Sequence, residues 1–418
     1  MEEDLMKKLF SLVLALCMLL SVAACAQAAD KTVLKISNYA VLESNYTEFW
    51  NDVEAGFEAA NPEYDIVWVT SEYSQTPNTV ITSAGGGDYC DGLFGELSWT
   101  STLAYAFEPV DDVLTEETLS AFDQNILASC VFDGDCYAIP YYVSPFILYY
   151  NTDLFAQAGI EVPTTYDELM TACEKLATLT SPITGNPVVP FGQTTASVPI
   201  SGTALTAFIY NFGGSVLDLE TGLMSIDNDG FRLAMETLQK LYNAGYMTPN
   251  QKLKELRQSF ANGELAMYYD QSWGYSGMSG INPDAVNFTA SAPALSGGEG
   301  KGESVLNAAV FMVSNKNGNA DGMNKFINYV TSDEVVGRYI REIAPAWSAK
   351  IAPMDVNPVL AGATGSQGNL KAVPMIETLN DLNLELDTLA QNVTLNGMSV
   401  DAAIEEFVNS SAYQTIGE

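Results

Sequence analysis

A strand, a helix and a second strand follow one another near the start of the chain, and this order constrains the fold most. Residues 33–36 and 65–69 are short apolar runs of strand length. Between them, residues 46–60 repeat apolar side chains at helical spacing, and Pro62 ends the helix. Such a β-α-β unit predicts a parallel, doubly wound α/β lobe. The ligand crevice of such a lobe lies beyond the carboxyl ends of its strands.

The rest of the 418 residues continues to alternate helix and strand patterns. Thr165 and Glu168 have the spacing of a capping box, which predicts the start of a helix over residues 166–179. Apolar periodicity also predicts helices over 78–84, 203–210 and 231–244, and a strand near 92–95. The length is sufficient for two or three domains.

The first residues are typical of an export signal. Lys7 and Lys8 precede an apolar run over residues 9–20, which is too short to span a bilayer comfortably. The acidic residues 2–4 are unusual before such a run, so the true start is either Met1 or Met6. Residues 22–25 resemble a lipobox, which predicts a signal peptide over 1–24 and lipidation of Cys25. Cleavage after Ala28 is the alternative and would release a soluble protein.

Charge and histidine content narrow the function classes. The 17 Lys and Arg residues stand against 52 Asp and Glu residues, a formal net charge of −35. This charge disfavours nucleic acid and anionic membrane surfaces as partners, because both would be repelled. The chain has no histidine, which excludes a Ser-His-Asp triad, an H-E-x-x-H zinc site and a histidine general base. Carboxylate-based catalysis remains open.

Three runs resemble one known family. Gly134 to Pro140 reads GDCYAIP, Tyr149 to Phe155 reads YYNTDLF, and Gly159 to Leu169 reads GIEVPTTYDEL. Together they resemble the G-x-x-Y-x-I-P, Y-N-x-D-L-F and G-I-x-x-P-x-T-x-x-E-L runs of bacterial extracellular solute-binding proteins, in the carbohydrate-binding, maltose-binding-protein-like group that serves ABC importers. A fourth run over residues 259–267 is similar to the group's F-x-x-G-x-x-A-M segment. The resemblance covers most of residues 30–350.

The resemblance implies an α/β protein of two doubly wound lobes joined by a hinge, the type II periplasmic-binding-protein fold. We expect an N-terminal lobe from residues 31–140 plus 287–342. The C-terminal lobe is then expected from residues 141–286 plus 343–418. The chain would cross between the lobes near Tyr141, Val286 and Ile343.

A sugar site needs polar partners for hydroxyls and aromatic rings for the apolar faces of the sugar, gathered in a cleft. Trp273 aligns with the ligand-stacking Trp that follows A-M in the family, and Asp270 lies three residues before it. The other expected contacts lie in two loops after strands and near the lobe crossings: Tyr39, Glu43, Glu96, Ser98, Trp99, Tyr142 and Trp347. We expect no catalytic residue, metal or cofactor.

Four cysteines follow the leader. Cys173 and Cys90 are interpreted as structural residues. Cys130 and Cys136 flank a hairpin signal, and an exported protein permits a disulfide between them. They face each other only if the loop between the strands has an odd number of residues.

These observations favour a substrate-binding lipoprotein of an ABC importer. It would be monomeric and held by lipid on the outer face of the cell membrane. It would capture a mono- or oligosaccharide by hinge closure and deliver it unchanged to the permease subunits, without binding nucleic acid. One alternative keeps the fold but binds a cationic metabolite such as a polyamine. A second alternative is a secreted glycoside hydrolase that uses two carboxylates in one cleft.

Overall fold

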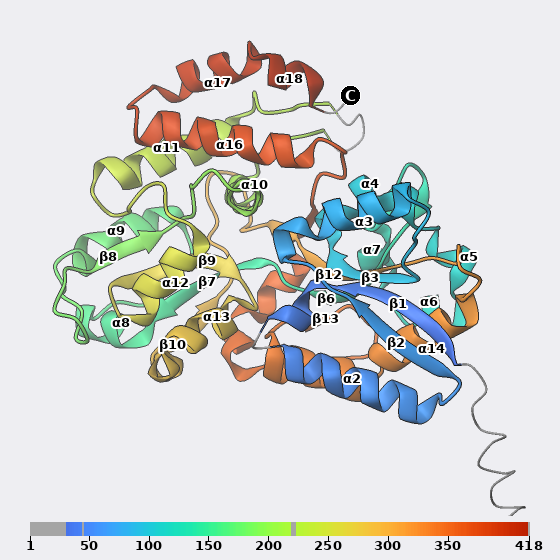
Figure 1. Cartoon of the computed structure of the whole chain (residues 1–418). Helices are drawn as coiled ribbons and strands as arrows, with labels where there is room; N and C mark the ends of the chain where they lie inside the picture. The colour runs from blue at the N-terminus through green and yellow to red at the C-terminus, as the bar shows by residue number, and fades with distance from the viewer. Residues whose placement is uncertain (1–30, 44–45, 219–222, 417–418) are drawn as a thin grey trace, which may run out of the picture.

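Two lobes lie side by side in the computed structural model, each built around its own β-sheet (Figure 1). The structure describes residues 31–43, 46–218 and 223–416. Cys25 and the predicted cleavage sites lie outside the described residues. Within those ranges, no helix combines the length and the apolar character that a membrane crossing requires.

The N-lobe contains a six-stranded sheet in the order β13-β6-β12-β3-β1-β2. Its strands are β1 (Thr32–Asn38), β2 (Tyr64–Val69), β3 (Gly92–Glu96), β6 (Ile139–Val143), β12 (Ala308–Val313) and β13 (Trp347–Ser348). Strand β1 runs parallel to β2 and β3. Helix α2 (Thr47–Ala60) connects β1 to β2, and α3 (Thr76–Gly85) leads to β3. The predicted β-α-β unit is therefore confirmed.

Further helices and two short strands complete the N-lobe, and some of them come from a late return of the chain to this lobe. They are α4 (Thr100–Leu103), α5 (Val110–Val113), α6 (Glu116–Leu119), α7 (Gln124–Ala128), β4 (Val131–Phe132), β5 (Asp135–Cys136), α14 (Ala320–Val330), α15 (Asp333–Arg338) and the helical turn η6 (Tyr339–Ile343). The lobe has a core of its own, in which the rings of Trp50, Phe94, Tyr141 and Phe311 pack against one another.

The C-lobe contains a four-stranded sheet in the order β10-β7-β9-β8. The strands are β7 (Phe146–Asn151), β8 (Val189–Gly192), β9 (Leu265–Gln271) and β10 (Thr289–Ala292). The helices are α8 (Thr152–Ala158), α9 (Tyr166–Leu176), α10 (Pro199–Asn211), α11 (Asp229–Asn243), α12 (Leu253–Ala261), α13 (Gly274–Ile281), α16 (Leu379–Thr394), α17 (Val400–Val408) and α18 (Ser411–Thr415). Helices α16 and α17 form an outer layer over α10 and α11 (Figure 1). This layer explains why α10 is buried on nearly every side.

The chain crosses between the sheets at positions shifted from those predicted. It leaves the N-lobe sheet between β6 and β7, returns between β10 and β12, and leaves again after β13. The predicted boundaries assigned β10 to the N-lobe and β13 to the C-lobe. Strand pairing reverses both assignments, because β10 pairs with β7 and β13 pairs with β6. Near the last crossing, η7 (Pro358–Gly368) precedes β14 (Leu370–Ala372), which pairs with β11 (Ser304–Leu306).

The expected disulfide between Cys130 and Cys136 is absent, because both thiols are free. The predicted hairpin exists as β4 and β5, but its turn consists of two residues, Asp133 and Gly134, with φ values of 51° and 91°. A two-residue turn with positive φ at both positions pairs Val131 with Cys136. Cys130 is therefore one position out of register, and this prediction was wrong.

Candidate ligand-binding cleft

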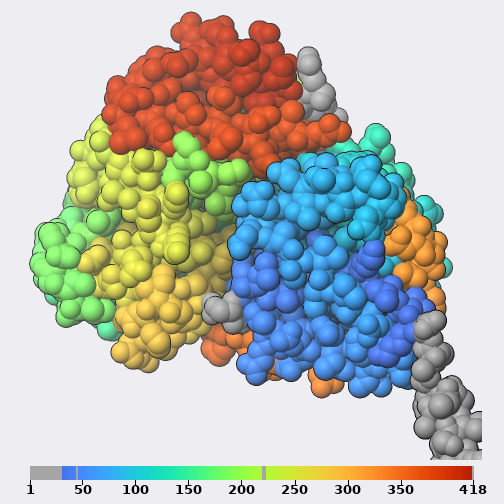
Figure 2. All heavy atoms as spheres, in the orientation of Figure 1, coloured from blue at the N-terminus to red at the C-terminus, as the bar shows by residue number. Residues whose placement is uncertain are grey.

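A cavity of about 410 Å³ lies between the lobes, within the range of about 300–1,000 Å³ that is common for small-molecule sites. The N-lobe and the C-lobe meet along a seam on the face in Figure 2, where the blue and the yellow surfaces touch. Both lobes line the cavity. The N-lobe contributes Tyr39, Ala40, Glu43, Tyr46, Tyr73, Glu96, Tyr142 and Tyr339, and the C-lobe contributes Val198, Ile200, Lys252, Leu253, Lys254, Arg257, Gln271 and Trp273.

The N-lobe wall is built at the carboxyl ends of parallel strands. Tyr39 follows β1 directly, and Glu96 is the last residue of β3, the neighbouring strand. The carboxyl ends of parallel strands meet at one edge of a sheet, so the two side chains come together there. The Tyr39 hydroxyl donates a hydrogen bond to Glu96 Oε1 at 3.2 Å.

Burial changes the protonation of the acids on this wall. Glu96 is only 8% exposed, and burial raises its pKa from 4.5 to about 7 although the hydrogen bond from Tyr39 acts in the opposite direction. Burial, assisted by the charge of Glu72, also raises the pKa of Glu43. A carboxyl group that titrates near neutrality can either accept or donate a hydrogen bond, which suits a hydroxylated ligand.

Five tyrosines give the cleft an aromatic lining around these acids. Tyr142 stacks on Tyr339 with 5.4 Å between ring centroids, and Tyr46 stacks on Tyr339 at 6.1 Å. Tyr73 meets Tyr39 edge-on at 5.0 Å. Burial raises the pKa of Tyr46 to about 12, so this phenol is neutral at physiological pH. The lining thus presents ring faces together with neutral hydroxyl groups.

On the C-lobe wall, a buried ion pair supports an indole ring. Arg257 on α12 binds Asp270 on β9 through Nε–Oδ2 and Nη2–Oδ1 contacts of 2.6 and 2.8 Å. The Arg257 guanidinium carbon lies 4.6 Å from the centre of the Trp273 ring, a cation–π arrangement. Asp270 is fully buried and does not line the cavity, so its expected ligand contact is replaced by a supporting role.

The next residue along β9 faces the cavity instead. Gln271 lines the cleft although only 2% of its surface is exposed. Successive side chains on a strand point to opposite faces, so Gln271 and Asp270 face opposite ways. The alternation along β9 was the signal that could have identified Gln271. The sequence interpretation also missed Tyr46, Arg257 and the two lysines near the start of α12.

Five of the predicted site residues line the cavity: Tyr39, Glu43, Glu96, Tyr142 and Trp273. Trp99 lies behind this lining, where its ring is 5.8 Å from that of Tyr39 and 5.2 Å from that of Tyr73. Ser98, beside it, is half-buried and outside the lining.

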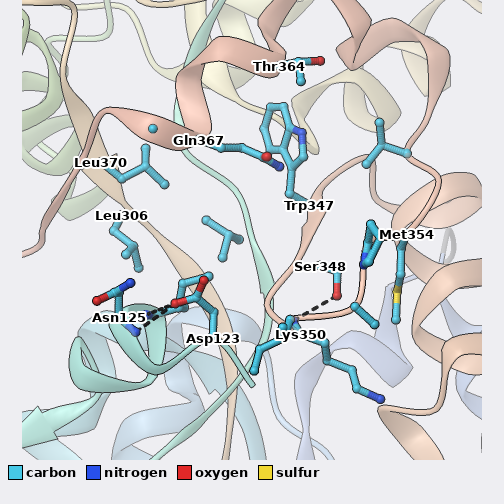
Figure 3. A pocket seen from close by; sticks show the side chains of 17 residues that line it. Asp123, Asn125, Leu306, Trp347, Ser348, Lys350, Met354, Thr364, Gln367 and Leu370 are labelled. Carbon is cyan, nitrogen blue, oxygen red and sulfur yellow. Dashed lines mark hydrogen bonds between the residues drawn. The ribbon is translucent and has the colours of Figure 1, made fainter. Parts of the chain in front are cut away.

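Trp347 lies in a different cavity, of about 490 Å³, beside the linking segments of the lobes (Figure 3). Trp347 on β13 pairs with Val143 on β6, and both residues line this second cavity. Tyr142, one residue earlier on β6, lines the cleft. Because neighbouring strand residues face opposite sides, the two cavities lie on opposite sides of β6. The placement of Trp347 in the ligand cleft was therefore wrong.

Comparison with known proteins matches the chain to one protein family. The model for the family described as "Bacterial extracellular solute-binding protein" matches residues 39–337. A binding protein of Brucella abortus is 29% identical over 170 residues, which are 38% of this chain and 39% of that relative. The diacetylchitobiose-binding protein of Streptomyces coelicolor is 26% identical over 304 residues, 67% of this chain and 66% of that relative. The chain thus spans well under half of the first relative and about two thirds of the second.

Solved structures share the fold. The GacH receptor of Streptomyces glaucescens, solved without ligand and in complex with acarbose, superposes with a TM-score of 0.79 at 19% identity. The match covers 92% of this chain and 98% of the receptor. At this level of identity the similarity establishes the two-lobed architecture alone.

Proposed function

The chain belongs to the bacterial extracellular solute-binding proteins, and we propose that it captures a carbohydrate in the interlobe cleft for an ABC importer. Members of this family bind solutes and are not enzymes, so the protein is not the glycoside hydrolase considered as an alternative. Two relatives are named for the sugars diacetylchitobiose and maltotriose, which supports a carbohydrate as the ligand.

The observation that carries this proposal is the pairing of aromatic rings with carboxyl groups across one cleft. Trp273 would stack on the apolar face of a sugar ring, and Tyr142 would pack against another part of it. Glu96, Glu43 and the Tyr39 hydroxyl would exchange hydrogen bonds with sugar hydroxyls. Carbohydrates combine both kinds of surface, so a wholly apolar or wholly charged lining would fit them less well.

Capture would use the hinge. Three connections join the lobes, and the cleft lining is divided between them. A ligand that contacts both walls binds the closed form better than the open form. It therefore shifts the equilibrium towards closure by the difference in affinity. No bond in the ligand is made or broken.

Delivery would take place outside the cytoplasm. In this proposal Cys25 carries the lipid that keeps the protein near its permease, and the closed form docks on the permease subunits. A single acyl chain binds membranes weakly, whereas a multiply acylated N-terminus anchors stably. Metabolic labelling with a radioactive fatty acid tests this step, because Cys25→Ser abolishes incorporation if Cys25 is the acceptor.

Calorimetry with a panel of neutral saccharides and spermidine tests the ligand class. A ligand present at 100 times its dissociation constant adds about 2.7 kcal/mol to the free energy of unfolding, which thermal shift detects. Trp273→Ala should weaken saccharide binding roughly tenfold through loss of the stacking surface. Trp347→Ala is the matched control, because it removes an indole from the other cavity and should leave affinity unchanged.

If spermidine binds and no saccharide does, the ligand is a cationic metabolite and not a carbohydrate. Equal loss of affinity in the two tryptophan variants would place the site elsewhere than in the cleft. Mass spectrometry of the ligand after incubation should recover it intact, and new products would contradict a binding function.

A further inference from the structure

Cations gather on one wall of the cleft in a chain that has few of them. Of the 17 Lys and Arg residues, Lys252, Lys254 and Arg257 lie within six consecutive positions, and all three line the cavity. Asp270 neutralises Arg257. Lys252 and Lys254 are exposed and, across the described ranges, form no ion pair with a carboxylate. Lys31, Lys35, Lys240 and Lys325 each have an acidic partner.

The position of the two lysines at the start of a helix increases the positive electrostatic potential around them. Lys252 is the N-cap of α12, and Lys254 lies in its first turn. The N-terminus of a helix carries partial positive charge, so acids are favoured there and cations are not. Helices α9 and α11 follow this rule with acids in their first turns. In α12 the acid Glu255 turns back to accept the Lys252 backbone N–H at 2.8 Å, and the two ammonium groups have no carboxylate partner among residues 31–43, 46–218 and 223–416.

A buried polar side chain without a partner lies in the same wall. Gln271 is 98% buried, lines the cavity and, among the described residues, has no hydrogen-bond partner for its side-chain amide. The Gln271 amide is not among the fully buried side-chain atoms that lack a partner in the described part of the chain, so it faces the cavity. Gln271 is therefore available to a ligand that enters beside the lysines.

The opposite wall carries the acids Glu43 and Glu96. The cleft is thus acidic and aromatic on the N-lobe side and basic on the C-lobe side. The net charge of −35 does not forbid an anion on the basic side, because charges more than about 8 Å away are largely screened at physiological salt.

We propose that the ligand is a saccharide with an anionic substituent, a carboxylate or a sulfate, that lies against Lys252 and Lys254. Gln271 donates a hydrogen bond to the same unit, while uncharged hydroxyls face Glu96 and Tyr39. This inference rests on the proposed function and specifies its substrate class. Lysine ammonium groups act as point charges rather than as planar forks, so they accommodate either anion.

The test is calorimetric titration of the exported protein with matched ligands. Each hexose disaccharide of a panel is compared with its counterparts that carry a carboxylate or a sulfate at C6. We expect an anionic counterpart to bind more tightly than the neutral parent, and the carboxylate and sulfate arms identify which anion is preferred. The K252Q/K254Q variant should bind the anionic ligand roughly tenfold more weakly and should lower the affinity for the neutral parent much less, as expected for the loss of two exposed charge pairs.

Two control variants separate local contact from overall charge. K175Q/K301Q removes two exposed lysines outside the cleft lining, so it changes the net charge equally and should leave affinity unchanged. K252R/K254R keeps both cations and should retain tight binding. Raised salt should reduce the advantage of the anionic ligand.

The outcomes distinguish this inference from the proposed function. If the neutral parent binds as tightly as its anionic counterparts, the substrate class is wrong and carbohydrate capture stands. If K252Q/K254Q weakens both ligands equally, the lysines act on lobe closure rather than on an anion, and the inference fails. If no saccharide of any kind binds, the proposed function itself is refuted.

Discussion

Glu96 couples the stability of the N-lobe to pH, and replacing it with glutamine should expose this coupling. The carboxyl group is 8% exposed and holds its proton more tightly in the folded protein, because burial raises its pKa from 4.5 to about 7. Between these two values the unfolded chain releases the proton while the folded chain keeps it. The folded state binds more protons, so the free energy of unfolding must fall as pH rises through this window.

The size of the effect follows from the shift. Each pKa unit corresponds to about 1.36 kcal/mol, so ionising Glu96 costs the folded state about 3 kcal/mol above pH 7. Glu96→Gln is neutral at every pH and retains an oxygen that accepts the bond from Tyr39. The variant should match the wild type near pH 4.5 and exceed its stability by about 3 kcal/mol at about pH 8.5.

Urea unfolding of both proteins across this pH range measures the difference directly. Glu117→Gln serves as a control, because Glu117 is exposed and surface substitutions of this kind usually change stability by less than about 0.5 kcal/mol. A difference between wild type and Glu96→Gln that stays constant from pH 4.5 to about 8.5 would refute the argument that burial controls this carboxyl group.

Three further substitutions test the charge and hydrogen-bond interpretation. Arg257→Met leaves the buried Asp270 without its cationic partner, although the Gln271 N–H still donates to it, and should cost about 3–5 kcal/mol in urea unfolding. Recovery of stability is expected when Asp270→Asn is added, and an unchanged single variant would contradict the buried pair. Asp387 lies buried on α16, where its carboxyl group accepts the Val198 N–H at 3.1 Å. Burial raises the pKa of Asp387 to about 8, so Asp387→Asn should gain stability over the wild type as pH rises towards 8. A gain that is larger at acid pH would disprove this reasoning. Tyr39→Phe removes the donor to Glu96 and should lower stability by about 1 kcal/mol at neutral pH, whereas no loss would mean that this bond contributes nothing.

Local features were predictable because they depend on neighbours in the sequence. The β-α-β unit over β1, α2 and β2 follows from apolar spacing. The N-cap predicted at Thr165 is present in α9, because Thr165 Oγ1 accepts the Glu168 N–H at 3.2 Å, but the reciprocal half of the capping box is shifted. The carboxylate of Glu168 accepts the N–H of Thr164 at 2.7 Å rather than that of Thr165. Even in this local motif, the backbone N–H that binds the Glu168 carboxylate lies one residue away from the predicted one.

Predicted site residues line the cavity where they stand at the end of a strand of known direction. Tyr39 and Glu96 met this condition, because parallel strands bring their carboxyl ends together. Asp270 did not, because a shift of one position along β9 reverses the face and Gln271 takes the cleft-facing side. Trp347 did not, because Trp347 and Ser348 of β13 both line the second cavity. On β9 the sequence pattern located the correct segment and left open which of two adjacent side chains enters the cleft.

Sequence alone determined the α/β class, the export-like leader, the lack of histidine chemistry and the family, since each depends on composition or on order along the chain. The tertiary structure decided the features that depend on contacts between residues that are not neighbours in the sequence. It paired Arg257 with Asp270 across 13 residues, put Cys130 out of register with Cys136, and separated Trp347 from the cleft. It also put Lys252 and Lys254 across the cleft from two acids, Glu43 and Glu96. The physical reason is that burial and pairing are properties of three-dimensional neighbours, and the same side chain has a different pKa and a different role once those neighbours are known.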